Sequence, residues 1–300
     1  MSRAAIVVLP VLLLPGCLQQ PAPVPSVHYE LGGNYQSGGV WRYPHEDFTL
    51  DETGLAEVFG AHGKLTEDGE IFDQGALAAG HPTLQLPALA RLTDLDTGRQ
   101  VLVRVNDRGP ASPGRLVEIT RRTAELLGAR PDTPIRVRLE VQEAESRAMA
   151  NALRADAPVL NVATASTATV QTETLAPPPG ATQAIHMRQA ASSPIPHETP
   201  PSVPPPPVPL RLPEAVRQVA VRPSVLMIDC GGFSRPEYAE ILRAKLAGLG
   251  AITTTSYDAP RERAYVVRIG PLSNVAAADT MLARALRVGA TDARIVVVQH

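Results

Sequence analysis

The chain is poor in cysteine and in aromatic residues, and it carries almost no net charge. Its 300 residues include two cysteines and one tryptophan, and the formal net charge at pH 7 is −2. Two cysteines cannot build a disulfide framework, and a nearly neutral chain has no electrostatic attraction for nucleic acid. The seven histidines are scattered, and no Cys/His spacing matches a set of metal ligands. We therefore expect no metal, no other cofactor and no nucleic-acid partner.

The first residues have the pattern of an export signal. The apolar run at residues 4–14 is too short to cross a bilayer as a helix. Residues 14–17 (LPGC) resemble the bacterial lipobox, which implies a signal peptide over residues 1–16 and lipidation of Cys17, with the protein facing the periplasm. Gln19 stands where an aspartate would retain a lipoprotein in the inner membrane, so the outer membrane is favoured.

Proline divides the rest of the chain. Close to half of the 30 prolines lie between Pro158 and Pro213, among alanine, serine and threonine. Such a composition buries too little apolar surface to offset chain entropy. It predicts a disordered linker over residues 143–222, and a shorter tether covers residues 17–26. Two modules remain, at residues 27–142 and 223–300.

The first module contains several short strand-like runs and one helix. Thr120 is a good N-cap for a helix over residues 121–127, and Gly128 ends it. Short strands with one helix favour a small β-barrel. The predicted strands lie at residues 54–59, 90–94, 100–105 and 135–141.

Asp107 follows one of these strands and precedes a turn made by Gly109 and Pro110. A carboxyl group at such a strand end can be partly desolvated, which raises its pKa toward the range that general acid catalysis needs. Aspartate is also a common turn residue. The residues alone leave both interpretations open.

Five blocks in this module follow one another in a recognisable order. They are residues 54–60 (GLAEVFG), 62–73 (HGKLTEDGEIFD), 81–87 (HPTLQLP), 103–110 (VRVNDRGP) and 114–119 (GRLVEI), and residues 35–44 (YQSGGVWRYP) precede them. Together they resemble the rare lipoprotein A family. The resemblance implies a double-psi β-barrel and, in active members, a lytic transglycosylase that cuts peptidoglycan strands lacking stem peptides.

The same resemblance places the functional residues at Glu70, His81 and Asp107, with Asn106 and Arg108 as candidate substrate contacts. It implies that the muramyl C6 hydroxyl attacks its own C1, so that no water is added. Ordinary glycosidases need two carboxylates, whereas an internal nucleophile needs one principal acid. We expect Asp107 to protonate the leaving oxygen and then to accept the hydroxyl proton, while Glu70 and His81 bind sugar or tune the pKa of Asp107.

Two places in this module depart from the family pattern. Residues 57–59 (EVF) stand where many members have Ser-Trp-Tyr, and Glu118 replaces the usual aspartate. These changes keep an alternative open, in which the protein is a non-catalytic glycan-binding lipoprotein scaffold at the septum.

The second module has clear helical periodicity. Ser234 and Glu237 form a capping box before the first helix, and Ser273 caps the second. With strands before, between and after these helices, the predicted order is βαββαβ, an α+β fold whose four-stranded antiparallel sheet carries both helices on one face.

Three motifs in this module resemble a sporulation-related repeat (SPOR) domain: residues 229–234 (DCGGFS), 267–272 (VRIGPL) and 292–295 (DARI). The resemblance implies a ferredoxin-like fold that binds glycan strands stripped of peptides at the division septum. Asp229 and Arg268 are candidate substrate contacts, and division proteins are candidate partners. We expect the long linker to let the barrel reach bonds near the bound strand.

Overall fold

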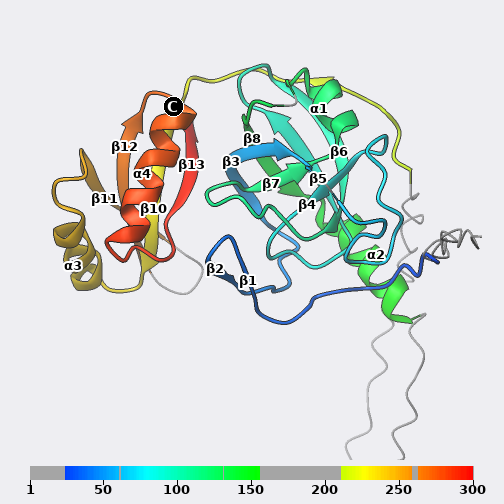
Figure 1. Cartoon of the computed structure of the whole chain (residues 1–300), viewed down its shortest axis with the longest axis horizontal. Coiled ribbons are helices and arrows are strands. Elements are labelled where there is room, and N and C mark those ends of the chain that lie inside the picture. Colours follow the sequence, from blue (N-terminus) through cyan, green and yellow to red (C-terminus); the bar gives the residue numbers. More distant parts are fainter. Residues whose placement is uncertain (1–23, 61, 131, 156–210, 259–262, 300) are drawn as a thin grey trace, which may run out of the picture.

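The computed structural model describes residues 24–60, 62–130, 132–155, 211–258 and 263–299. It contains a β-barrel and an α+β module (Figure 1). The predicted signal peptide, the lipidation site at Cys17 and the central part of the linker lie outside the described residues. In the described part of the chain, no helix has the length and apolar character needed to cross a membrane.

Six strands close the barrel in the order β4-β7-β3-β8-β5-β6, and a pairing between β4 and β6 completes the ring. The pairings β3–β7 and β4–β6 are parallel, and the others are antiparallel. The predicted double-psi β-barrel is confirmed. The strands are β3 (Asp51–Val58), β4 (Ala78–Gly80), β5 (Ala88–Asp94), β6 (Arg99–Asp107), β7 (Val117–Ile119) and β8 (Ile135–Val141).

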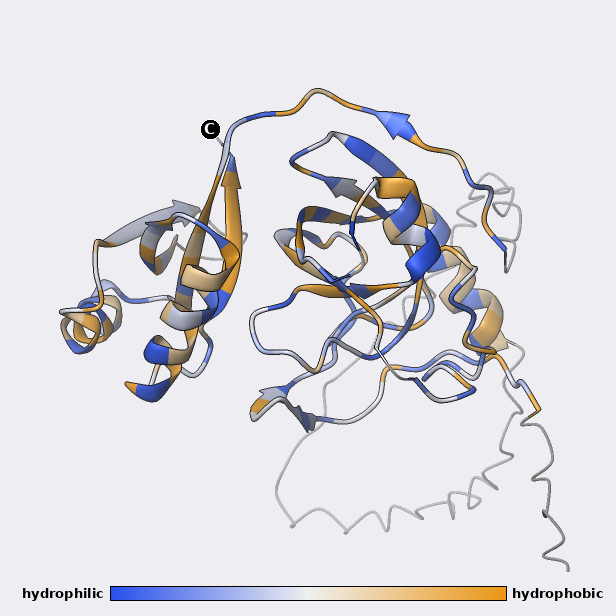
Figure 2. Ribbon diagram, turned by 45° about the horizontal axis from the view of Figure 1, so that its top comes forward, coloured by the Kyte–Doolittle hydropathy of each residue, from blue (hydrophilic) through white to orange (hydrophobic). Residues whose placement is uncertain are grey.

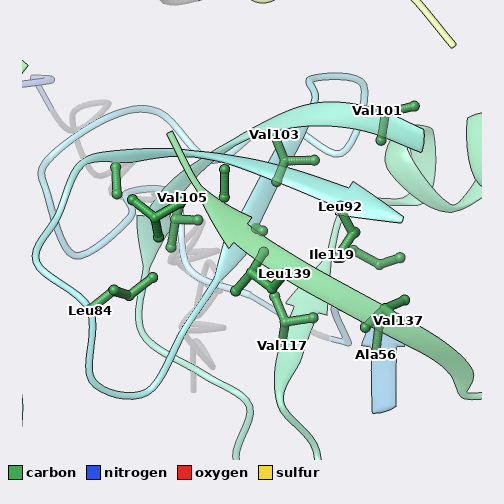
Figure 3. Packing of buried hydrophobic residues seen from close by; sticks show 14 of the residues in the cluster. Ala56, Leu84, Leu92, Val101, Val103, Val105, Val117, Ile119, Val137 and Leu139 are labelled. Carbon is green, nitrogen blue, oxygen red and sulfur yellow. The ribbon is translucent and has the colours of Figure 1, made fainter. Parts of the chain in front are cut away.

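Alternate residues of the strands fill the barrel. Val101, Val103 and Val105 of β6 are at most 2% exposed and belong to the same buried cluster as Leu139 of β8 (Figure 3). Each such side chain contributes about 1.5–3 kcal/mol when it leaves water. The period of two along β6 is thus the reason that this segment forms a strand.

A β-bulge interrupts this period at the end of β6. Ala79 of β4 pairs with Val105, but Gly80 pairs with Asp107, so Asn106 is an extra residue. An extra residue turns the following side chain to the opposite face of the strand. Asp107 therefore points away from the apolar core that holds Val105.

The short helix α1 (Arg121–Leu127) begins and ends as predicted, with the Thr120 side chain accepting from the Thr123 amide and with Gly128 in the left-handed conformation. The predicted linker start at residue 143 is wrong, because helix α2 (Glu143–Ala155) follows β8 directly. Ser146 is buried in α2 and exchanges hydrogen bonds with the backbone of Leu89. Residues 143–155 contain no proline and are rich in alanine, glutamate and arginine, which favour a helix, and contact with the barrel stabilises it.

The last residues before the second module also lie on the barrel. Strand β9 (Arg217–Gln218) pairs antiparallel with β6, and the Gln218 side chain donates to the Thr97 carbonyl oxygen at 2.6 Å. We call residues 211–223 the strap. In Figure 1 the strap runs along the barrel to the second module (yellow). The predicted linker thus loses its last residues, as well as its first, to ordered structure.

The second module has the predicted βαββαβ order, and its sheet has the strand order β11-β12-β10-β13 with every pairing antiparallel. Both helices contribute buried residues to one core with β10 and β12, and Figure 2 colours the apolar residues along the ribbons of the module orange. The elements are β10 (Ser224–Phe233), α3 (Pro236–Leu246), β11 (Ile252–Asp258), β12 (Arg263–Leu272), α4 (Val275–Arg287) and β13 (Arg294–Gln299).

Both predicted caps in this module are wrong by one residue. The N-cap of α3 is Arg235, which makes no side-chain cap bond, and Pro236 occupies the first turn. The N-cap of α4 is Asn274, whose side chain accepts from the Ala277 amide. Proline is preorganised for the first helical position, which moves the start of α3 past the serine.

The two modules contact each other along β3 and β13. Thr53 donates its hydroxyl to the Val297 carbonyl oxygen at 2.6 Å. Leu55 of the barrel is fully buried within the core cluster of the second module. Arg115 forms two hydrogen bonds with Asp279 of α4, at 2.6 and 3.0 Å. Apolar contact and a bidentate ion pair therefore join the modules.

Candidate active site

Asp107 lies at the barrel end, in a position that is nearly closed to solvent. Its side chain is 7% exposed, and its Oδ1 accepts hydrogen bonds from the amides of Glu67 (3.1 Å) and Arg108 (2.8 Å). Burial raises the pKa of Asp107 above its ordinary value, and the neighbouring His62 together with these two amides reduces that rise. The site thus has an acid that holds its proton more strongly than a solvated aspartate.

His62 lies directly beside this acid, with its Nε2 at 2.5 Å from Oδ2 of Asp107. The imidazole stacks on Phe72, with 3.9 Å between ring centroids, and Phe59 meets its edge at 5.5 Å. These rings fix the orientation of the imidazole. Sequence reasoning missed His62, although it begins the second of the blocks that resemble the family.

A row of acidic side chains crosses the sheet at this point. Gly80 pairs with Asp107 on one side and with Glu118 on the other, and Glu118 pairs in turn with Glu57. The neighbours of Glu118 in β7, Val117 and Ile119, face the core, so Glu118 faces outward. Burial, then Glu57, then Asp107 raise the pKa of Glu118 to about 7.

Glu70 binds side chains of β6 other than that of Asp107. Its carboxylate accepts from Arg104 Nε at 2.6 Å and from Asn106 Nδ2 at 2.8 Å. The side chains of Arg104 and Glu70 are 5% and 11% exposed, so this is a buried ion pair. Within the described structure, no hydrogen bond or ion pair joins Glu70 to Asp107. The predicted residues Glu70 and Asn106 therefore lie together, next to the bulge.

His81 is buried and is held by the backbone. Its Nδ1 faces the amides of Thr83 (3.3 Å) and Leu84 (3.1 Å), so this nitrogen must be the acceptor. Burial, with Arg108 as the next cause, lowers the pKa of His81 to about 3, and the ring is neutral at physiological pH. Its backbone amide donates to the Asp107 carbonyl oxygen at 2.9 Å.

Arg108 connects two chain segments by their carbonyl oxygens. Its guanidinium donates at 2.7 Å to Leu31, which lies in the segment before the barrel at residues 24–50, here called the lead-in segment. It also donates to Leu84 and His81. The lead-in segment forms a hairpin of β1 (Tyr35–Ser37) and β2 (Val40–Arg42). Arg108 therefore fixes the loop that carries His81 against the lead-in segment.

The candidate residues of the second module form a pair across two strands. Asp229 and Arg268 are register partners, and Arg268 Nε lies 2.7 Å from Asp229 Oδ1. Arg294 and the half-exposed Tyr257 line the same hollow of the sheet. Cys230 next to this pair is buried, and burial raises the pKa of its thiol to about 12.

Comparison with known proteins identifies both modules. A family model described as a lytic transglycolase matches residues 51–139, and a model described as a SPOR domain matches residues 223–297. The endolytic peptidoglycan transglycosylase RlpA of Pseudomonas aeruginosa PAO1 is 32% identical over 267 residues, which are 84% of this chain and 72% of that relative. The chain belongs to the RlpA family.

Other RlpA proteins match the barrel region alone. RlpA of Yersinia pestis is 40% identical over 115 residues, and this alignment covers 38% of the chain and 31% of that relative. The chain thus spans about a third of the Yersinia protein. The solved SPOR domain of Pseudomonas aeruginosa RlpA is 25% identical, covering 25% of the chain and 99% of that domain with a TM-score of 0.22.

Proposed function

We propose that this RlpA-family chain is an endolytic lytic transglycosylase. It cuts the β-1,4 bond between N-acetylmuramic acid and N-acetylglucosamine in peptide-free glycan strands and leaves 1,6-anhydro ends. The names of its relatives support this activity. The observation that carries it is the position of Asp107, which the bulge turns out of the barrel core and which lies 2.5 Å from His62 in a nearly closed site.

In this proposal Asp107 is both acid and base. Its proton passes to the glycosidic oxygen as the bond to C1 breaks, and the muramyl C6 hydroxyl oxygen attacks C1. The Asp107 carboxylate then accepts the proton of that hydroxyl, so the group returns to its starting state and no water is used. His62 stabilises the carboxylate between the two transfers. A positioned acid of this kind contributes about 10²- to 10⁴-fold to the rate.

The other predicted site residues act by positioning Asp107. Glu70 and Asn106 fix the bulge through their hydrogen bond with each other and through that of Glu70 with Arg104. Arg108 and neutral His81 fix the loop at residues 81–84. The Glu70 carboxylate is held by Arg104 and Asn106, and the Arg108 guanidinium is held by the carbonyl oxygens of residues 31, 81 and 84. We therefore assign them to the geometry of the site and leave Asp107 as the group that reacts.

The second module supplies binding to the same substrate. We place the glycan contact on the face of its sheet that carries no helices, at Asp229 and Arg268, where an ion pair and Tyr257 offer polar and aromatic surface for sugars. The proposal also includes lipidation of Cys17, an outer-membrane anchor facing the periplasm, and action at the division septum with division proteins as partners. The lipobox resemblance and the SPOR match support these assignments.

The decisive test uses Asp107→Asn in the full chain. We expect mass spectrometry of peptide-free glycan strands to show 1,6-anhydro ends with the native chain, and at least about 100-fold fewer with the variant. Asp96→Asn, in an exposed turn, is the matched control and should keep native activity. If the native chain binds strands without producing anhydro ends, the protein is a scaffold and the proposal fails.

A further inference from the structure

A small pocket lies where the β1–β2 hairpin, the loop after β4 and the second module meet. Its volume is about 140 Å³, and its lining includes Arg42 of the hairpin, residues 81–83 and 113–116 of the barrel, and Arg294 and Ile295 of β13. Sites that enclose a whole drug-sized ligand have volumes of roughly 300–1,000 Å³. This pocket therefore has the size for one side group of a longer ligand.

Two side chains of the pocket carry donors without an acceptor. Nδ1 of His81 accepts from backbone amides, so Nε2 carries the proton, and this buried nitrogen has no hydrogen-bond partner among the described residues. The same is true of Nε of Arg42. Arg42 and Tyr35 are cross-strand partners, and the Tyr35 hydroxyl donates to the Pro82 carbonyl oxygen at 2.9 Å. This contact sets Arg42 beside the loop that carries His81.

The lining of the pocket has an excess of positive charge. It contains three arginines and one acid, Glu52. Glu52 lies 2.6 Å from Arg294, and Arg115 lies 2.6 Å from Asp279. Arg42 forms no ion pair within the described structure, and burial lowers the pKa of its guanidinium. A guanidinium in this state favours an anion, and the planar fork of its N–H groups matches a carboxylate.

The pocket lies close to the reacting acid. His81 follows Gly80, the register partner of Asp107, and the His81 amide donates to the Asp107 carbonyl oxygen at 2.9 Å. Burial raises the pKa of Tyr35, and among the charges that act on it Arg42 lowers this pKa while Asp107 raises it. Tyr35 therefore lies near both groups. Because neighbouring strands are about 5 Å apart, a glycan strand seated on Asp107 can place a side group in the pocket.

We propose that this pocket binds the free lactyl carboxylate of a muramyl residue at the cutting site. Arg42 supplies the positive charge, and His81 Nε2 donates to one carboxylate oxygen. In a peptide-free strand the lactyl group is an anion, whereas in a peptide-bearing strand it is a neutral amide that continues into the peptide. The inference rests on the proposed transglycosylase function, and it gives that function a physical basis for selecting peptide-free strands.

The test compares two forms of the same peptide-free strands. One form keeps its lactyl carboxylates, and in the other they are converted to primary amides, which have nearly the same size but no charge. We expect the native full chain to form anhydro ends from the free form with a kcat/KM about 10- to 100-fold higher, the factor that a hydrogen bond to a charged group supplies. Arg42→Gln should lower kcat/KM for the free form to the value for the amide form, which should itself change little.

Two further variants control for the fold and for the loss of an arginine. Arg42→Lys keeps the charge without the planar fork, and it should retain part of the preference. Arg121→Gln, at the exposed first position of α1, should retain all of it. Because Arg42 has no ion pair in the described structure, its replacement leaves no charge unpaired, and we expect Arg42→Gln to melt at the native temperature.

A second measurement needs no cleavage. In Asp107→Asn, nitrogen-15 NMR of the His81 ring is recorded as each form of the strand is added. We expect the free form to shift the Nε2 signal and the amide form to leave it in place. A free form that leaves the signal unmoved would overturn the inference.

The kinetic outcomes separate this inference from the proposed function. An equal fall of kcat/KM for both forms in Arg42→Gln would mean a merely structural role and would overturn the carboxylate site. A native chain that cuts both forms equally well overturns it too. If the His81 signal responds to the free form alone but the native chain yields no anhydro ends, the carboxylate site stands and the transglycosylase proposal fails.

Discussion

Replacing Glu70 should lower the free energy of unfolding of the barrel, independently of its effect on activity. In Glu70→Ala, Arg104 keeps its buried place, where only 5% of its side chain is exposed, but loses the carboxylate at 2.6 Å. Removing one partner of a buried ion pair costs about 3–5 kcal/mol, because the remaining charge is left without compensation. For a domain of this size, that loss lowers the melting temperature by more than roughly 10 °C.

A double variant separates the fold from the chemistry. Replacing both partners, as Glu70→Leu with Arg104→Met, leaves no unpaired charge, and we expect most of the lost stability to return. Differential scanning calorimetry of the full chain measures the stability, and the anhydro-end assay measures activity on the same samples. Our reasoning predicts that activity follows stability across the three proteins.

Two results would refute this reasoning. Glu70→Ala could melt at the native temperature and still be inactive, or the double variant could regain its melting temperature without activity. In either case the Glu70 carboxylate acts on the substrate, and the ion pair with Arg104 is not its main role.

Two further predictions concern burial and the contact between modules. Burial, and after it Glu70, raises the pKa of Asp68 from 3.8 to about 7. Between these two pKa values the folded state binds a proton that the unfolded state has released. The stability of the native chain therefore falls as the pH rises between them. Chemical denaturation should therefore show that Asp68→Asn is more stable than the native chain at pH 8, by up to about 4 kcal/mol, and gains little at pH 4. An equal gain at both pH values would contradict this. Leu55→Asp places a charge in the contact between modules and should raise the radius of gyration measured by X-ray scattering, while Leu126→Asp, at the partly buried helix α1, should not.

The regular parts of the fold could be predicted because they follow local patterns. The alternation of Val101, Val103 and Val105 identified β6, and Thr120 with Gly128 fixed α1 at both ends. The bulge at Asn106 has no such pattern, since it arises from pairing with β4. It decides which way Asp107 points, so the sequence located the acid without its orientation.

The site was predicted in part for the same reason. The resemblance brought Glu70, His81 and Asp107 to attention, but the contacts of the first two lead to Arg104 and to the backbone at residues 83–84. His62 reaches Asp107 because Phe72 supports its ring. Such a contact joins segments that are distant along the chain, and no local propensity records it.

The strap limits how far the second module can lie from the barrel. Pairing of β9 with β6 leaves residues 219–223 between the barrel and β10, and six Cα steps span at most about 21 Å. In the proposed function, the distance between the second module and the cutting site is therefore limited by this short piece and by the direct contacts between the modules. Under that proposal, the chain cuts close to the place where the second module holds the strand.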